Sequence, residues 1–169
     1  EKSDVPNKNV CPICLGLPGS RPMLNKEALL KALKVARILN CKINRRFFFS
    51  RKVYFYPDLP KNFQITQYEI PIGFDGVYKG IRIKRVHLEE DPARIYYKQG
   101  ILKSEYSLID YNRSGIPLVE IVTYPDFRSA EDVEEFLRSL VKELEYFEIF
   151  NPKKNTWRVD INVSLEKGY

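Results

Sequence analysis

The spacing of apolar residues predicts two amphipathic helices. From 25 to 39, apolar residues recur at helical spacing after Asn25, a residue type that caps helix N-termini. From 130 to 147, a longer apolar stripe follows Ser129, and Asp132 three residues on forms a capping-box-like pair with it. The acidic residues of this second helix lie off the stripe, so we interpret them as a solvated face.

Aromatic and β-branched residues predict strands between the two helices. We expect strands within 42–56, interrupted by a turn at 50–52. A further turn is expected from 73 to 80, where glycines stand at both ends, and a strand over 81–88. Residues 1–23 carry four prolines and are expected to be irregular.

Three more strands complete the pattern. Two of them, over 107–110 and 116–123, are joined by residues 111–115, which have the composition of a turn. The last, over 157–166, alternates between apolar and polar residues almost without error. Short connections suit a mostly antiparallel or mixed sheet, so the chain is predicted to be a single α+β domain over 1–169 with two main helices.

Composition restricts the class of protein. The 169 residues are 44% hydrophobic, which is enough for a buried core, and wholesale disorder is excluded. No apolar run is long enough to span a membrane, and the start lacks the features of a secretory signal. Three cysteines without an extracellular context favour a reducing, cytoplasmic setting. The chain does not begin with Met, so we expect a fragment or a trimmed product.

Charge is unevenly distributed along the chain. Residues 21–52 contain ten Lys or Arg and one acid, whereas residues 131–148 contain seven acids and two basic residues. A basic half suggests a polyanionic ligand such as phosphate or nucleic acid. A solvated basic face accounts for the charge equally well, so both interpretations stay open.

Two carboxylates fall on apolar strand faces. Glu120 stands between apolar neighbours, and Glu90 shares a face with Leu88. An ionised carboxylate there is costly unless a cation or hydrogen-bond donors neutralise it, which Mg²⁺ or a buried Arg–Glu pair would do. Glu89 and His87 fall on the opposite face together with Arg85, and these residues are interpreted as a polar network. A single histidine argues against a histidine-based metal site or triad.

The polar face of the predicted last strand is a second candidate. It carries Arg158, Asp160, Asn162 and Ser164. Such residues can line a phosphate or metal site on a sheet floor, and an ordinary half-exposed strand would show the same pattern. We expect these four side chains to line the same cleft as Glu120.

The cysteines include one motif. Cys11 and Cys14 form a C-x₂-C pair, the spacing of half a tetrahedral zinc site, and one pair is weak support because four ligands are needed. Cys41 follows the apolar end of the first helix and is expected to be a core thiol. The two common glycine-rich nucleotide-binding loops do not occur in the sequence.

Nine short motifs, taken in order, resemble one family. They are VCPICLGLPG at 10–19, LNK at 24–26, RK at 51–52, YFYPDLPK at 54–61, QITQY at 64–68, HLEED at 87–91, DYNR at 110–113, GIPLVEIV at 115–122 and RVDINVS at 158–164. The family is the B-type subunit of the aspartyl/glutamyl-tRNA(Asn/Gln) amidotransferase, with the E-type subunit of the archaeal glutamyl-tRNA(Gln) amidotransferase as close kin. The resemblance covers nearly the whole chain.

The resemblance implies a fold and a reaction. The fold is a cradle domain with a glutamine-synthetase-like α+β architecture. In the reaction, ATP phosphorylates the side-chain carboxylate of Glu or Asp misacylated on tRNA(Gln) or tRNA(Asn), and ammonia then displaces the phosphate. The implied partners are the A-type amidase subunit, which supplies ammonia from glutamine, the small C-type subunit, and the tRNA. The alternatives are a non-catalytic tRNA-binding module and a fragment that docks subunits.

The resemblance also implies functional residues. One glutamate of the Glu89–Glu90 pair and Glu120 would bind Mg²⁺, and strand parity favours Glu90 over Glu89. Arg158 and Asp160 are expected to take part in catalysis. Residues expected to bind the nucleotide are Lys52, Tyr54, Asn112, Arg113, Asn162 and Ser164.

The chain departs from the family in several respects. The family's core begins with a strand carrying a Glu-x-His metal-ligand motif and a C-x-C pair, both upstream of Glu1. We therefore expect Cys11 and Cys14 to lack zinc partners in this chain, and zinc to be structural in the full-length protein. The family's C-terminal helical and tail domains are also expected to be missing, so the fragment is expected to be inactive in isolation. Residues 92–94, Pro-Ala-Arg, stand where the family has a small residue, Gly and Lys.

Overall fold

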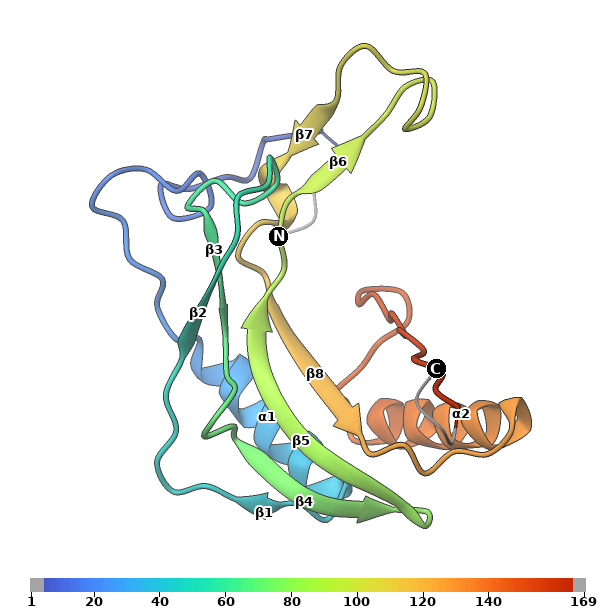
Figure 1. The fold of residues 1–169 in the computed structure, drawn as a ribbon. Helices are drawn as coiled ribbons and strands as arrows, with labels where there is room; N and C mark the ends of the chain where they lie inside the picture. The colour runs from blue at the N-terminus through green and yellow to red at the C-terminus, as the bar shows by residue number, and fades with distance from the viewer. Residues whose placement is uncertain (1–4, 166–169) are drawn as a thin grey trace. The chain divides into compact units, whose positions relative to one another are not determined.

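The computed structural model describes residues 5–165 (Figure 1). The chain divides into two compact units, residues 1–127 and 128–169, and each is described by itself. Division into contact units does not by itself separate folding domains, so the single domain over 1–169 stays a prediction. No helix of the described residues is long and apolar enough to cross a membrane.

A four-stranded antiparallel sheet forms the centre of the first unit (Figure 1). Its strands, in spatial order, are β1 (Lys42–Ile43), β4 (Gly73–Tyr78), β5 (Ile81–Glu90) and β8 (Pro117–Thr123). Helix α1 (Lys26–Ile38) contacts β4 and β5. The predicted cap is confirmed, because the Asn25 side chain accepts a hydrogen bond from the Ala28 backbone N–H at 3.0 Å. The α+β fold class is therefore confirmed.

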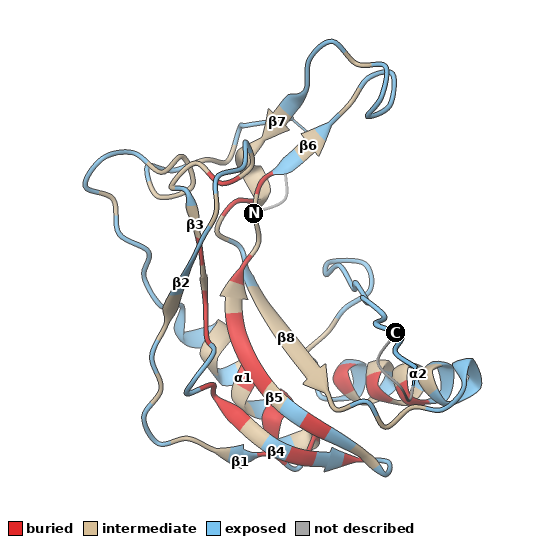
Figure 2. Ribbon diagram, viewed as in Figure 1, coloured by how far each residue is buried: buried red, intermediate tan, exposed pale blue. Residues whose placement is uncertain are grey.

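The core lies between α1 and the sheet, where the buried positions of both meet (Figure 2). Ala32 of α1 packs with Ile72 and Leu88, and the rings of Phe47 and Phe49 close this cluster. These two phenylalanines are predicted to lie in a strand, and the structure places them in a strandless connection instead. Phe47 and Phe49 are apolar because they pack against the core, and this packing does not require a strand.

The turn predicted over 73–80 is wrong, since most of this stretch is strand β4. Only Lys79 and Gly80, both with positive φ, form the turn into β5. A Cβ atom at Gly73 would lie 2.8 Å from the Ala36 Cβ, and one at Gly76 would lie 2.4 Å from the Leu39 carbonyl oxygen. The glycines therefore allow β4 to approach α1 closely, a role that sequence cannot distinguish from turn formation.

Two small antiparallel pairs flank the central sheet (Figure 1). They are β2 (Ser50–Val53) with β3 (Phe63–Thr66), and β6 (Arg94–Tyr96) with β7 (Leu108–Asp110), followed by the 3₁₀ turn η1 (Tyr111–Arg113). The turn predicted at 50–52 is wrong, because these residues pair with β3 along β2. The strand predicted over 107–110, that over 116–123 and the turn between them are confirmed within a residue.

Strand β3 is joined to β5 through side chains. The ladder between β4 and β5 ends at Val86, and β3 lies beside the next part of β5. There the Gln67 side-chain oxygen accepts from the Leu88 N–H at 3.0 Å, and the Gln64 amide donates to the Glu90 carbonyl at 2.8 Å. Both glutamines are buried, so their amides replace the backbone ladder that a fifth strand would provide.

The second unit contains helix α2 (Ala130–Tyr146). Its predicted cap is confirmed, because Ser129 accepts a hydrogen bond from the Asp132 N–H at 3.1 Å. The strand predicted over 157–166 is wrong within the part that the structure describes: residues 157–165 are exposed and belong to no strand, and Glu166 lies outside that part. Alternation alone does not make a strand, which also needs a hydrogen-bonded neighbour.

Candidate functional site

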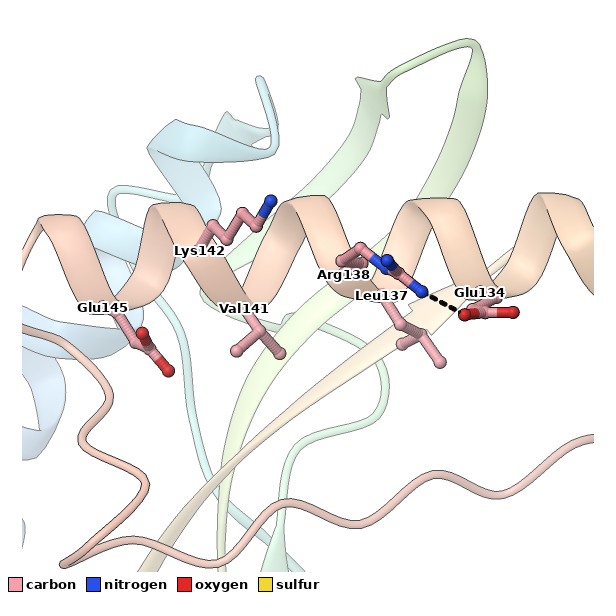
Figure 3. Close-up of a pocket in the computed structure, with 6 residues that line it drawn as sticks. All are labelled: Glu134, Leu137, Arg138, Val141, Lys142 and Glu145. Atoms are coloured by element: carbon pink, nitrogen blue, oxygen red, sulfur yellow. Dashed lines mark hydrogen bonds and ion pairs between the residues drawn. The ribbon is translucent and has the colours of Figure 1, made fainter.

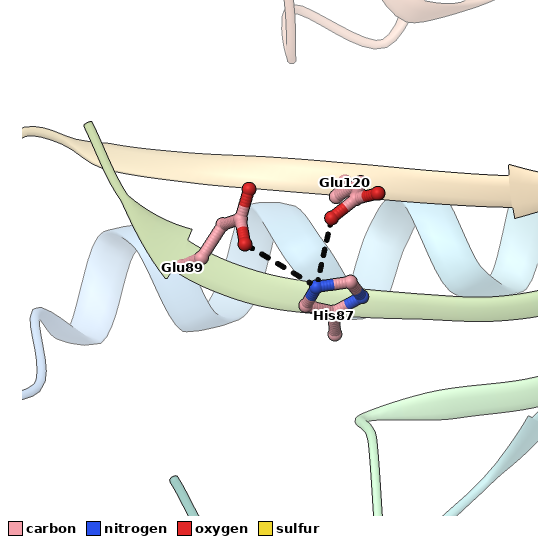
Figure 4. Close-up of side chains that lie close together, drawn as sticks. All are labelled: His87, Glu89 and Glu120. Atoms are coloured by element: carbon pink, nitrogen blue, oxygen red, sulfur yellow. Dashed lines mark ion pairs between the residues drawn. The ribbon is translucent and has the colours of Figure 1, made fainter. Parts of the chain in front are cut away.

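Two glutamates and the single histidine meet where β5 pairs with β8 (Figure 4). His87 stands opposite Glu120 in the register, and Glu89 follows two residues later on the same face of β5. The His87 Nε2 atom lies 3.1 Å from Glu120 Oε2 and 3.6 Å from Glu89 Oε2. One ligand atom from each residue lies within 4.8 Å of the others, and we call these three residues the His–Glu cluster.

The members of the His–Glu cluster change one another's protonation. Burial disfavours the charged imidazole, with His87 1% exposed, but hydrogen bonds and attraction to Glu120 and Glu89 outweigh burial and raise the His87 pKa. The hydrogen bond with His87 lowers the Glu120 pKa despite partial burial. The lowered pKa favours the ionised Glu120 carboxylate, and its side chain is 43% exposed and therefore open to a ligand.

Cationic and polar groups surround the His–Glu cluster. The positive charges of Arg85 and Lys52 lower the Glu120 pKa further. Thr66 donates a hydrogen bond to Glu89 Oε2 at 3.1 Å. Burial raises the pKa of the Tyr54 hydroxyl, and nearby carboxylates, Glu89 among them, raise it further. The Lys52 ammonium lies 5.7 Å from the centre of the Tyr54 ring, and a nucleotide-binding role for these two residues stays a prediction.

Arg85 lies on β5 two residues before His87, on the strand face where the sequence predicts a polar network with His87 and Glu89. Its guanidinium carbon lies 5.9 Å from the centre of the Tyr68 ring, and its Nε atom is buried. Neither this Nε nor the His87 Nδ1 has a hydrogen-bond partner among the described residues. Strand parity alone groups Arg85 with His87 and Glu89, and it does not show which of these groups would bind a ligand.

Glu90, predicted with Glu120 as a magnesium ligand, lies outside the His–Glu cluster. Its carboxylate turns away from the cluster, and Lys61 Nζ lies 2.6 Å from Glu90 Oε1. Strand parity correctly places Glu89 and Glu90 on opposite faces of β5. The predicted polar network of His87 and Glu89 is also confirmed. The choice of Glu90 fails because of how β8 pairs with β5. The register sets Glu120 opposite His87, and Glu120 therefore lies on the sheet face of Glu89.

Asn112 and Arg113, expected at a nucleotide, hold chain segments together. The Asn112 side chain accepts from the Asn9 N–H and donates to the Val5 carbonyl, both at 2.8 Å. The Arg113 guanidinium donates to two carbonyls of the loop after β5, each at 2.9 Å. Their contacts are structural, and a nucleotide-binding role for them stays a prediction.

The cysteine pair forms a tight turn. The Cys11 and Cys14 sulfur atoms lie 3.2 Å apart, and the Cys14 N–H approaches the Cys11 sulfur at 3.4 Å. These hydrogen bonds lower the Cys11 pKa, whereas burial and the hydrogen bond with Cys11 raise the Cys14 pKa, so the thiolate that zinc needs is favoured at Cys11 alone. Cys41 is buried, as expected of a core thiol, and burial raises its pKa to about 11.

The polar residues predicted for the last strand lie in the second unit. Arg158 Nε and Asp160 Oδ1 are 3.3 Å apart, and both side chains are exposed. Asn162 and Ser164 are exposed as well. A cleft that these residues share with Glu120 stays a prediction.

A shallow hollow along α2 offers less chemistry (Figure 3). Its lining comes from one helix: Glu134, Leu137, Arg138, Val141, Lys142 and Glu145. Glu134 and Arg138 pair with each other, and the other lining residues are the aliphatic Leu137 and Val141 and the charged Lys142 and Glu145. A binding site usually combines convergent polar groups with perturbed pKa values, and the His–Glu cluster has both.

The fold and the cluster together define an α+β structure that presents two carboxylates, an imidazole and the guanidinium of Arg85 on one sheet face. This arrangement suits a divalent cation and an anionic ligand. Comparison with known families gives a more specific result. The family model described as the GatB/GatE catalytic domain matches residues 1–169, and the chain belongs to this family.

Curated relatives agree with this assignment. The chain is 49% identical over 174 residues to the B-type subunit of the aspartyl/glutamyl-tRNA(Asn/Gln) amidotransferase of Methanoregula boonei, covering 97% of this chain and 36% of the relative. It is 50% identical over 170 residues to the protein of the same name from Haloquadratum walsbyi, covering 95% of this chain and 34% of the relative. The family resemblance is confirmed, and the chain spans about a third of the length of these relatives.

Proposed function

We propose that the protein activates and amidates Glu or Asp misacylated on tRNA(Gln) or tRNA(Asn). ATP would phosphorylate the side-chain carboxylate, and ammonia from a partner amidase subunit would displace the phosphate. The relatives carry the name of such an amidotransferase subunit, which supports the A-type amidase subunit and the small C-type subunit as partners and the cytoplasm as location. The observation that carries the proposal is the His–Glu cluster with its flanking cations.

The chemistry explains why such a cluster is useful. A carboxylate is a poor acyl donor until one of its oxygens becomes part of a phosphate leaving group. Phosphoryl transfer depends on positioning and on neutralising the charge of the phosphate oxygens. Mg²⁺, when bound, would supply part of this neutralisation.

The described residues fit a magnesium ion. Mg²⁺ is usually held by one or two carboxylates, with water and phosphate oxygens completing its shell. Glu89 and Glu120 offer two carboxylates that converge from neighbouring strands, and the exposure of Glu120 leaves room for other ligands. We therefore assign Glu89 and Glu120 as the proposed magnesium ligands, with Glu89 in place of Glu90.

The surrounding residues would prepare the site. Thr66 orients Glu89 through its hydroxyl, and His87 holds the two carboxylates toward each other. Lys52 and Arg85 add positive charge beside Glu120, where phosphate oxygens of ATP would be attracted. Tyr54 lies near the same carboxylates and would contact the nucleotide.

Two other groups of residues belong to the proposal. Arg158 would meet phosphate oxygens through its planar fork, and Asp160 would add an oxygen ligand. Asn162 and Ser164 would bind the nucleotide beside them. Cys11 and Cys14 would form half of a structural zinc site in the full-length protein.

The Glu120→Gln variant of the full-length protein, assembled with its partner subunits, tests the proposal. Glutamine is nearly isosteric, so we expect the fold to persist and amidation of misacylated tRNA to be lost, while the partner still hydrolyses glutamine. Glu105→Gln, at an exposed glutamate between β6 and β7, is the matched control and should amidate normally. Normal amidation by Glu120→Gln would instead favour a non-catalytic tRNA-binding or docking role.

A further inference from the structure

Lys61 and Glu90 form an ion pair that is almost removed from solvent. Their charged atoms lie 2.6 Å apart, and the two side chains are 11% and 9% exposed. Burying two charges removes their hydration, so such a pair is often neutral for stability compared with apolar residues. A contribution to stability alone therefore does not explain why the two charges are buried here.

The ion pair lies at the point where β3 is attached to β5. The Ile65 N–H donates to the same Glu90 oxygen at 2.9 Å, and the Gln64 amide donates to the Glu90 carbonyl. The adjacent Thr66 hydroxyl donates to Glu89 in the His–Glu cluster. These bonds come from side chains or end on them, so they set the register less firmly than a backbone ladder does.

The backbone of Lys61 packs closely against the segment that contains Gly16. Gly16, next to the cysteine turn, has a φ of +63°, and a Cβ atom there would lie 2.8 Å from the Pro60 carbonyl carbon and 2.9 Å from the Lys61 nitrogen. The Lys61 ammonium also lies 5.4 Å from the centre of the Phe63 ring. The Lys61 ammonium therefore extends from a closely packed loop, which suits it to fix the position of the Glu90 carboxylate.

We propose that the Lys61–Glu90 ion pair positions Glu89 for the divalent cation. The pair fixes the end of β5 against β3, so that the Thr66 hydroxyl meets the Glu89 carboxylate and turns it toward Glu120. Lys61 and Glu90 are positioning residues, and neither touches the cation. The inference rests on the proposed function of the His–Glu cluster.

The sign of the effect separates positioning from simple electrostatics. Lys61 is a positive charge beside Glu90, the neighbour of Glu89, so its removal would strengthen cation binding if charge alone mattered. Loss of positioning has the opposite result, because Glu89 would no longer be held toward Glu120. Residues that orient metal ligands typically contribute about 10- to 100-fold to metal affinity.

The test is Mn²⁺ binding to the full-length protein, measured from the electron paramagnetic resonance signal of the free ion. We expect Lys61→Met to raise the Mn²⁺ dissociation constant about 10- to 100-fold. Lys61→Arg, which keeps the charge, should restore most of the affinity. Arg82→Met is the matched control, because it breaks the ion pair with Asp126 near the opposite end of β5 and should leave Mn²⁺ binding unchanged. Unchanged or tighter binding by folded Lys61→Met would overturn the inference.

Two further variants cover the other outcomes. If Lys61→Met does not fold, Lys61→Gln keeps a donor for the Glu90 carboxylate, and its Mn²⁺ affinity should fall between those of the wild type and Glu120→Gln. An unchanged affinity in folded Lys61→Gln would refute positioning. Glu120→Gln tests the metal proposal separately: if it binds Mn²⁺ normally the proposed site fails, and if it alone loses binding only the role of Lys61 fails.

Discussion

Gln67 provides a sharp test of how β3 is joined to β5. Its side chain is fully buried, its oxygen accepts from the Leu88 N–H at 3.0 Å, and its amide approaches the Phe48 carbonyl at 3.4 Å. Gln67→Leu keeps a similar size but removes both polar groups. The bond to the Phe48 carbonyl is long and part-buried, whereas the bond from the Leu88 N–H is buried, so its loss leaves a buried N–H unpaired.

The expected loss of stability follows from that one group. A buried N–H without a partner costs about 1–3 kcal/mol, which lowers the Tm of a protein of this length by roughly 2–12 °C. Calorimetry measures the Tm, and hydrogen exchange should show the Leu88 amide exchanging about fivefold faster or more. Gln99→Leu, on an exposed loop, is the control and should stay within about 0.5 kcal/mol of wild type. An unchanged Tm together with full protection at Leu88 would refute the side-chain attachment.

Three further predictions concern the thiols and the nucleotide. Alkylation of the native chain at pH 8 should modify Cys11 and spare Cys41. Burial raises the Cys41 pKa to about 11, so this thiol stays protonated at pH 8. Mass spectrometry after proteolysis measures labelling at both cysteines, and rapid labelling of Cys41 would contradict its burial. Elemental analysis of the isolated 169-residue chain should find well below one zinc ion per chain, because Cys11 and Cys14 supply only half of a tetrahedral ligand shell. Stoichiometric zinc in a monomer would contradict this prediction. Arg158→Lys should impair tRNA-dependent ATP cleavage well beyond a surface substitution, because lysine lacks the planar fork; wild-type rates would remove Arg158 from the site.

Elements fixed by local interactions could be predicted from the sequence. Both long helices begin at the predicted caps, Asn25 and Ser129, because a cap depends on residues within one turn. Strands depend on distant neighbours, and there the prediction failed. The residues at 50–52 pair with β3 rather than turning, and the alternating stretch 157–165 has no strand partner within the described chain.

The site shows the same limit in more detail. Apolar neighbours identified Glu120, and strand parity separated Glu89 from Glu90. The choice between those two glutamates required the register of β5 on β8, which places His87 opposite Glu120 and which the sequence of either strand alone does not contain. Lys61 was missed for a related reason, since its partner Glu90 is distant in sequence and no periodic pattern connects them.

The most direct test of the central claim is ATP cleavage in the absence of ammonia. Radiolabelled ATP is mixed with the full-length protein, its partner subunits and misacylated tRNA, and release of ADP is followed within one turnover. The account predicts tRNA-dependent ADP formation by the wild type and by Glu105→Gln, and none by Glu89→Gln or Glu120→Gln. Wild-type ADP formation by both Glu89→Gln and Glu120→Gln would contradict the assignment of the His–Glu cluster as the site of carboxylate activation.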